Sequence, residues 1–190
     1  MSYKNQILET ASALFAEKGF KETSISELSK RSKAAEGTIF YHFKCKEDIL
    51  INLLQKVKED ILNRVKKQKW SSSNGLDMVE EIVHLYFELS EEMENEFLLL
   101  FRNYPYQLAA VNPKCRENIE AIYNCFVDLL ARAVEAGKKD GSIRDIHPVK
   151  AALIVFSMAN GMARFNFYNL FPLGPVYQEL IESCRRTLKA

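Results

Sequence analysis

The chain has 190 residues, of which 47% are hydrophobic and 27% are charged, and its formal net charge is +1. This composition is that of an ordinary globular protein, so it excludes a disordered or collagen-like chain. The most apolar run, residues 151–163, is too short and too interrupted to span a bilayer, and the first residues lack a signal-peptide core. We therefore expect a cytoplasmic protein with no membrane contact.

The cysteines and histidines are scattered along the chain. They are Cys45, Cys115, Cys125, Cys184, His42, His84 and His147. They form no C-x-x-C pair and no spacing typical of metal ligands, so we predict reduced thiols, no metal and no cofactor. A redox-sensing thiol is the alternative.

Charge is distributed unevenly. Residues 1–70 hold 14 of the 26 Lys and Arg but only 9 of the 25 Asp and Glu, a balance of +5, and the remaining residues have a balance of −4. A basic first part and an acidic remainder suit a polyanionic partner at one end. A solvated charged helix face between Lys56 and Lys69 explains part of the same excess.

Two helices are predicted at the start of the chain. Apolar residues recur at helical spacing over residues 3–18, and Gly19 supplies a left-handed stop. Ser24 and Glu27 form the S-x-x-E capping box that opens the second helix, and a turn follows it near Lys33.

A short third helix and a long fourth helix follow. The third covers residues 35–42, and the fourth begins at Lys46 and keeps an apolar helical period to about residue 69. Either Phe40 or Phe43 must turn inward to fill so small a core. Short helices joined by a tight turn and followed by a long one are the ingredients of a helix-turn-helix, whose recognition helix enters the major groove of DNA.

Every later segment also has a helical pattern, so the predicted fold class is all-α. The segment WSSSNG, residues 70–75, is a linker because its residues compete with helix formation. Glycines at 137, 141 and 174 are predicted to mark breaks between helices. The expected helices cover residues 76–92, 94–103, 113–136, 148–171 and 175–188.

The third helix carries the side chains that reading DNA requires. Gly37 lets the backbone come close to the bases, and Thr38 offers a hydroxyl and a methyl group. Tyr41 and His42 present donors to phosphate, and Lys46 sits at the positive end of the next helix. The alternative is a buried aromatic corner beside a solvated lysine.

The segments ILETASALFAEKGF, TSISELSKRS and GTIFYHFKCKEDIL, all within residues 7–50, resemble the DNA-binding domain of the TetR family of bacterial transcriptional regulators. The run G-T-I-F-Y-H-F-x-x-K-E is the specific part of the resemblance. It covers about a quarter of the chain, and the remainder agrees with the family only in length and helical pattern.

The resemblance implies an N-terminal three-helix DNA-binding domain and a C-terminal helical domain for effector binding and dimerisation. Glu36 either accepts from a cytosine amino group or only favours the helix dipole. Lys33, Ala35 and Phe40 depart from the family pattern, which leaves the base preference open. The implied DNA-binding residues are Thr23, Ser24, Ser26, Glu36, Gly37, Thr38, Tyr41, His42 and Lys46.

The family also implies an effector pocket among the central helices and a dimer interface made by the last two helices. Plain core packing is the alternative for the pocket residues. We predict effector contacts from Leu85, Tyr86, Leu89, Phe97, Phe101, Tyr104, Tyr123 and Phe126, with Tyr104, Tyr123, His84 and Arg102 as polar groups. Predicted dimer contacts are Val155, Ala159, Met162, Leu180, Ile181 and Leu188.

Together these features predict a ligand-responsive regulator, most simply a repressor. Residues 1–46 form the helix-turn-helix domain, residues 46–69 the connector, and residues 70–190 the effector-binding and dimerisation domain. The partners are a near-palindromic double-stranded DNA operator, a small hydrophobic or aromatic effector, and a second copy of the chain. The alternatives are a helical enzyme using Glu81, His84, Glu88 and Arg102, or a helical scaffold that binds proteins.

Overall fold

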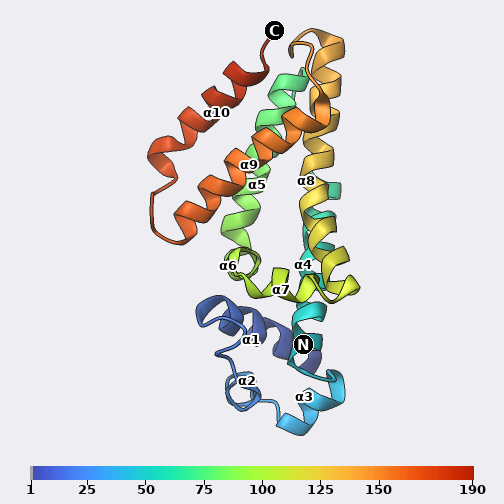
Figure 1. The fold of residues 1–190 in the computed structure, drawn as a ribbon, viewed down its shortest axis with the longest axis vertical. Helices are drawn as coiled ribbons and strands as arrows, with labels where there is room; N and C mark the ends of the chain where they lie inside the picture. The colour runs from blue at the N-terminus through green and yellow to red at the C-terminus, as the bar shows by residue number, and fades with distance from the viewer. Residues whose placement is uncertain (1) are drawn as a thin grey trace. The chain divides into compact units, whose positions relative to one another are not determined.

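The computed structural model describes residues 2–190, and Met1 lies outside the described residues. Within that range the chain is helical and has no named strand, apart from an isolated bridge between Ile143 and Lys189 (Figure 1). The helices are α1 (Tyr3–Glu17), α2 (Ile25–Ser32), α3 (Glu36–His42), α4 (Lys46–Lys67), α5 (Gly75–Glu92), α6 (Glu94–Phe101), α7 (Tyr104–Ala109), α8 (Pro113–Asp140), α9 (Pro148–Phe167) and α10 (Gly174–Leu188). The predicted all-α class is confirmed.

The helices group into two compact units. The first contains the residues up to Asn63 together with Met93–Ile122, and the second contains Arg64–Glu92 together with Tyr123–Ala190. Helices α4 and α8 contribute to both. This grouping cuts the chain differently from the predicted domains, because α6, α7 and the first part of α8 join the N-terminal helices.

The first three helices form as the sequence predicts. Helix α1 ends at Glu17, and Gly19 follows in the left-handed conformation with φ +90°. The Ser24 hydroxyl accepts a 3.1 Å hydrogen bond from the backbone N–H of Glu27, which caps α2. The Glu27 carboxylate binds Lys18 instead of completing the capping box. Lys33 ends α2 with φ 54°, a conformation that glycine adopts at less cost.

The small N-terminal core contains Phe43 and Ile39, which are both buried. Phe40 is 52% exposed, so Phe43 is the aromatic residue that turns inward. Helices α1, α2 and α3 pack on one another, and α6 packs on α1 (Figure 1).

The second unit is built around α5, α9 and α10, which pack pairwise. Gly137 was predicted to break a helix, but α8 runs through it to Asp140. A Cβ atom on Gly75 would lie 2.1 Å from the Gly137 nitrogen, so the two glycines permit close approach of α5 and α8. None of the helices in residues 2–190 is long and apolar enough to cross a membrane.

The predicted set of helices needs two corrections. Helix α9 ends at Phe167 rather than near residue 171, because Asn169 takes a left-handed φ of 52°. The N–H groups of Asn169 and Leu170 then bond back to the Asn166 and Phe165 carbonyls at 3.0 Å, the pattern of a Schellman cap. Helix α7 was not predicted at all.

Candidate functional site

Helix α3 presents one face to solvent and buries the other. Ile39 is fully buried, whereas Glu36, Gly37 and Phe40 are exposed and Tyr41 is 84% exposed. Thr38 and His42 are half-buried at the edges of this face. The Tyr41 and His42 rings meet edge to face, with 5.1 Å between their centroids. Two exposed aromatic rings on so short a helix indicate a contact surface rather than a core.

The predicted contacts at the start of α2 divide into two kinds. Ser24 and Ser26 are exposed. Thr23, in contrast, is only 1% exposed, and its hydroxyl donates a 2.9 Å hydrogen bond to the Gly19 carbonyl oxygen. The predicted phosphate contact from the Thr23 side chain therefore needs correction, because the hydroxyl already closes the turn between α1 and α2.

Lys46 has a structural role that sequence analysis missed. Its ammonium group donates to the carbonyl oxygens of Phe20 at 2.8 Å, Thr23 at 2.7 Å and Lys21 at 3.4 Å. Partial burial lowers the pKa of Lys46, and the nearby carboxylates of Glu47 and Glu22 oppose that effect. Lys46 thus ties the start of α4 to the α1–α2 turn, and its longest bond, to Lys21, is the one that a phosphate could most easily replace.

Helices α6 and α7 hold the same turn from another direction. The Phe20 and Tyr104 rings stack with their centroids 4.0 Å apart. Arg102 donates to the carbonyl oxygens of Ala16 at 2.6 Å and Glu17 at 3.0 Å, at the end of α1. The helix-turn-helix is therefore anchored on α6 and α7 within one compact unit.

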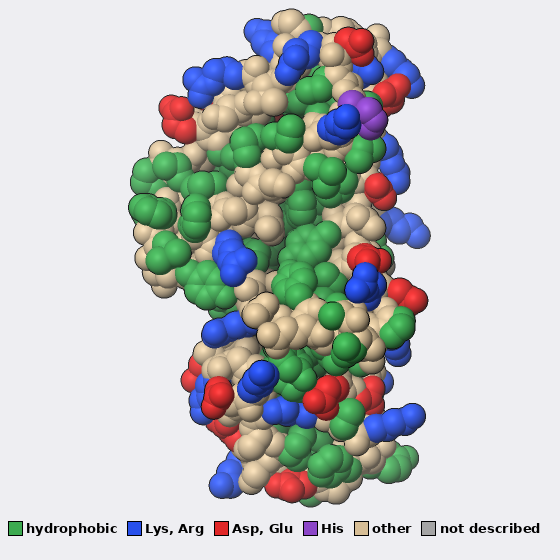
Figure 2. Space-filling view, viewed as in Figure 1, with side chains coloured by type: hydrophobic (Ala, Val, Ile, Leu, Met, Phe, Trp, Pro, Cys, Tyr) green, Lys and Arg blue, Asp and Glu red, His purple; other side chains and the backbone are tan. Residues whose placement is uncertain are grey.

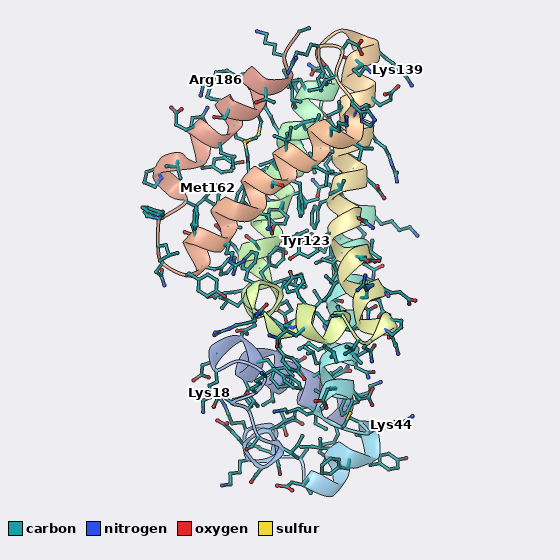
Figure 3. The ribbon with its side chains drawn as sticks, in the orientation of Figure 1. Lys18, Lys44, Tyr123, Lys139, Met162 and Arg186 are labelled. Atoms are coloured by element: carbon teal, nitrogen blue, oxygen red, sulfur yellow. The ribbon has the colours of Figure 1, made fainter. Side chains whose placement is uncertain are left out.

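Three exposed lysines of the helix-turn-helix were not among the predicted DNA contacts. Lys30 and Lys33 lie at the end of α2, and Lys44 lies between α3 and α4 (Figure 3). The signal for Lys44 was available in the sequence, because it occupies the junction directly after the recognition helix.

The predicted effector residues do not form a single group. Phe97, Phe101 and Tyr104 belong to the first unit, and the other five belong to the second. Six of the eight side chains, Leu85, Tyr86, Leu89, Phe97, Phe101 and Phe126, are buried.

An aromatic cluster in the second unit brings part of that set together. Tyr86 meets Phe126 and Phe156 edge to face, with centroids 5.0 and 5.4 Å away. The ring of Tyr123 in α8 (Figure 3) meets the ring of Phe156 in α9, with their centroids 5.8 Å apart. The Tyr86 hydroxyl donates a 2.8 Å hydrogen bond to Asn160 Oδ1. Phe156 and Asn160 were missed, because α9 was assigned to dimerisation alone.

The residues proposed for the enzyme alternative serve separate partners. Glu81 accepts from the Ser71 hydroxyl at 2.6 Å, and Arg102 binds the carbonyls at the end of α1. Only His84 and Glu88 meet, with 3.1 Å between His84 Nε2 and Glu88 Oε1. No group of three potential metal ligands occurs within residues 2–190.

The predicted dimer contacts also need correction. Val155, Ala159, Leu180, Ile181 and Leu188 are buried within the protomer, and only Met162 of the predicted set is partly exposed. The five buried residues lie on the inner sides of α9 and α10, which pack against the rest of the second unit.

The outer side of α9 is the exposed apolar surface. Leu153, Ile154 and Phe165 are 49%, 50% and 42% exposed. A groove of about 410 Å³ between α9 and α10 continues this surface, and Met162 and Val176 line it (Figure 3). Hydrophobic side chains gather over α9 and α10 in Figure 2. We call this apolar face, from Leu153 to Phe165 with Val176, the α9–α10 face.

Two of the four cysteines are protected by burial. All four are unpaired, and Cys115 and Cys184 are buried. Burial raises the pKa of each of these two thiols to about 11, which keeps them protonated and poorly nucleophilic.

Comparison with known proteins agrees with the geometry of the N-terminal unit. The model of the bacterial regulatory proteins, tetR family, matches residues 7–53. The HTH-type transcriptional regulator QacR of Staphylococcus aureus is 26% identical over 176 residues, which cover 87% of this chain and 86% of QacR. The fatty acid metabolism regulator protein of Bacillus subtilis is 24% identical over 147 residues, covering 77% of this chain and 74% of that protein.

A solved structure shares the whole fold. It is a transcriptional regulator described as putative, from Saccharomonospora viridis, in complex with choline. It superposes with a TM-score of 0.87 at 20% identity and covers 98% of this chain and 97% of its own.

Proposed function

Because the chain belongs to the TetR family of transcriptional regulators, we propose that it is a ligand-responsive repressor that binds a near-palindromic operator as a homodimer. A small hydrophobic or aromatic effector releases it from DNA. The observation that carries this proposal is α3, a short helix that buries Ile39 on its inner side and exposes Gly37, Phe40 and Tyr41 on its outer side.

We propose two sets of DNA contacts. Gly37, Thr38 and Glu36 approach base edges in the major groove, with Ser26 beside them. Phosphates are bound by side chains around them, because positioning contacts normally surround the base contacts. The proposed phosphate contacts are Ser24, Tyr41, His42, Lys44 and Lys46.

Dimerisation is proposed to occur through the α9–α10 face. Exposed apolar patches of this kind commonly mark protein interfaces, and a two-fold dimer brings the same patch together twice. A two-fold dimer also places two recognition helices one DNA turn apart, roughly 34 to 36 Å.

The effector is proposed to bind near the aromatic cluster of Tyr86, Tyr123, Phe126 and Phe156. Apolar side chains with a few polar groups, here the Tyr86 hydroxyl and Asn160, are what a drug-sized ligand requires. The choline complex of the regulator from Saccharomonospora viridis supports a small-molecule ligand. Release follows if the effector binds more tightly to the dimer geometry that does not fit DNA.

Selection of bound sequences from a random double-stranded DNA pool tests the proposal. We expect an inverted repeat whose half-sites lie about one helical turn apart. A Tyr41→Ala, His42→Ala double variant with an unchanged melting temperature is the control, and it should enrich nothing. If the wild-type dimer also enriched nothing, DNA binding as the function would be contradicted.

A further inference from the structure

A pocket in the C-terminal unit borders the aromatic cluster, because Phe87 lines it and the Phe87 and Tyr86 rings meet edge to face with centroids 5.8 Å apart. It has a volume of about 360 Å³ and is formed by α5, the end of α9 and the start of α10. This size is within the range of small-molecule sites. The residues that line it are His84, Phe87, Glu88, Glu91, Asn166, Leu173, Gly174 and Tyr177.

Aromatic rings form one part of the pocket. The Phe87 and Tyr177 rings meet edge to face with centroids 5.6 Å apart, and His84 meets Tyr177 at 6.2 Å. The Tyr177 hydroxyl lies 3.1 Å from His84 Nδ1, and His84 Nε2 lies 3.1 Å from the Glu88 carboxylate. This chain of contacts holds the Tyr177 ring in place on α10 against α5.

Charge at the pocket is negative. Glu88 and Glu91 line it, and both are exposed to solvent, whereas no lysine or arginine is among the lining residues. Arg185 of α10 lies outside the lining and is bound to Glu80 through a 2.8 Å hydrogen bond from Nη2. Burial raises the pKa of Tyr177, and the nearby carboxylates of Glu80 and then Glu88 add to this effect.

One backbone donor at the positive end of α10 is not available to an anion. The Leu173 backbone N–H donates a 3.1 Å hydrogen bond to Asn166 Oδ1, so this donor at the helix start is already occupied. Ring faces attract cations through their quadrupole, and carboxylates attract them through charge. The combination favours a cation with apolar substituents over a neutral or anionic ligand.

We propose that this pocket binds a monovalent organic cation, such as a quaternary ammonium compound. Phe87 and Tyr177 contact its apolar substituents, and Glu88 and Glu91 balance its charge. The pocket adjoins the α9–α10 connection, where Phe165 and Phe171 meet with centroids 5.7 Å apart. A bound cation would therefore hold this connection in place beside the α9–α10 face, which is the proposed dimer surface. Only this effect on the dimer surface rests on the proposed function.

Calorimetric titration of the full chain with two isosteric probes tests the proposal. The cationic probe is (4-hydroxyphenyl)trimethylammonium, and the uncharged probe is 4-tert-butylphenol. We expect the cation to bind at least roughly fivefold more tightly, because only its charge differs. Equal affinity of the two probes, or no binding of the cation at millimolar concentration, would overturn the proposal.

Variants then place the cation. Glu88→Gln, Glu91→Gln together should weaken cation binding roughly five- to tenfold and leave the uncharged probe unchanged. Tyr177→Leu should weaken both probes, by roughly threefold. Glu120→Gln, an exposed carboxylate on α8 outside the pocket, is the matched control.

The proposed site and the proposed function are contradicted in different experiments. If the double glutamine variant, folded to the same melting temperature, bound the cation like the wild type, the cation would bind elsewhere and the proposed site would be wrong. These titrations contain no DNA, so failure of the proposed function appears only in the DNA selection and failure of this site only here.

Discussion

The Lys46 ammonium group lies 4.5 Å from the centre of the Phe20 ring and donates a 2.8 Å hydrogen bond to the Phe20 carbonyl oxygen. The same ring stacks on Tyr104 of α7. Phe20, in the α1–α2 turn, is therefore contacted by both α4 and α7. This arrangement fixes the start of α2, where Ser24 and Ser26 are exposed.

Replacing Lys46 by alanine should affect both stability and DNA binding. The free energy of unfolding should fall by about 1 to 3 kcal/mol, because partly buried carbonyl oxygens lose their donor. Operator affinity should fall, and the slope of log affinity against log salt should flatten by about one unit. Chemical denaturation and fluorescence anisotropy at several salt concentrations measure the two effects.

Lys44→Ala is the matched control for Lys46→Ala. Lys44 is exposed, so its replacement should change the free energy of unfolding by less than about 0.5 kcal/mol while flattening the salt dependence of DNA binding. Unchanged stability of Lys46→Ala would contradict the structural role given to Lys46.

Gly37→Ala should separate helix stability from DNA binding. A Cβ atom at Gly37 meets nothing within 4 Å, so the free protein accommodates it. We expect the free energy of unfolding of the N-terminal unit to rise by about 0.5 kcal/mol, because alanine is the better helix former. Operator affinity should nevertheless fall, since the added methyl group occupies the edge that approaches the bases. Equal or tighter DNA binding would remove Gly37 from the contact surface.

Charges on the α9–α10 face should dissociate the proposed dimer. Leu153→Asp together with Phe165→Asp places carboxylates in the exposed apolar surface, where pairing would bury them without partners. Light scattering after size-exclusion chromatography should show a folded monomer. Val111→Asp is the control, because Val111 is 81% exposed in the turn before α8 and lies outside this face. A dimer that persists in the double variant would place the interface elsewhere.

Asp140 should make the C-terminal unit sensitive to acid. Its carboxylate accepts hydrogen bonds from Ser142 and from the backbone N–H of Gly75 at 2.7 Å, and these bonds lower the pKa of Asp140, with the Ser142 contribution first. A carboxyl whose pKa is lower in the folded state stabilises the fold above its unfolded pKa. That stabilisation is lost as the pH falls through the folded pKa.

Asp140→Asn should therefore lower the melting temperature near neutral pH, and the difference from the wild type should shrink below about pH 4. Thermal denaturation at several pH values across this range measures the two melting temperatures. Asp128→Asn, at an exposed position of α8, should show no such pH-dependent difference. A constant difference at every pH would mean that the carboxylate charge is not responsible.

Much of the N-terminal unit could be predicted because its signals are local. Gly19 and the Ser24 cap define helix ends through bonds within a few residues. The exposed face of α3 follows from the same spacing. The role of Lys46 was not predictable, because its partners lie 23 to 26 residues earlier in the chain.

The C-terminal unit was harder because apolar periodicity does not tell which side of a helix meets its own chain. Val155 and Leu180 fit an apolar stripe, yet that stripe faces the protomer's core and the outer face carries Leu153 and Phe165. Gly137 looked like a helix break, but a Cβ atom there would lie 2.5 Å from the Ile143 side chain, and this contact explains a glycine inside α8. Pocket residues such as Glu88 and Tyr177 come from distant helices, so no local pattern joined them.

A DNA-reading role for α3 is decided by the affinity of the purified chain for its selected operator, compared with a scrambled duplex at the same salt concentration. We expect the dimer to prefer the operator by at least about 10³-fold and the Tyr41→Ala, His42→Ala variant to lose this preference. Equal affinity for the two duplexes, or an undiminished preference in that variant, would contradict a DNA-reading role for α3.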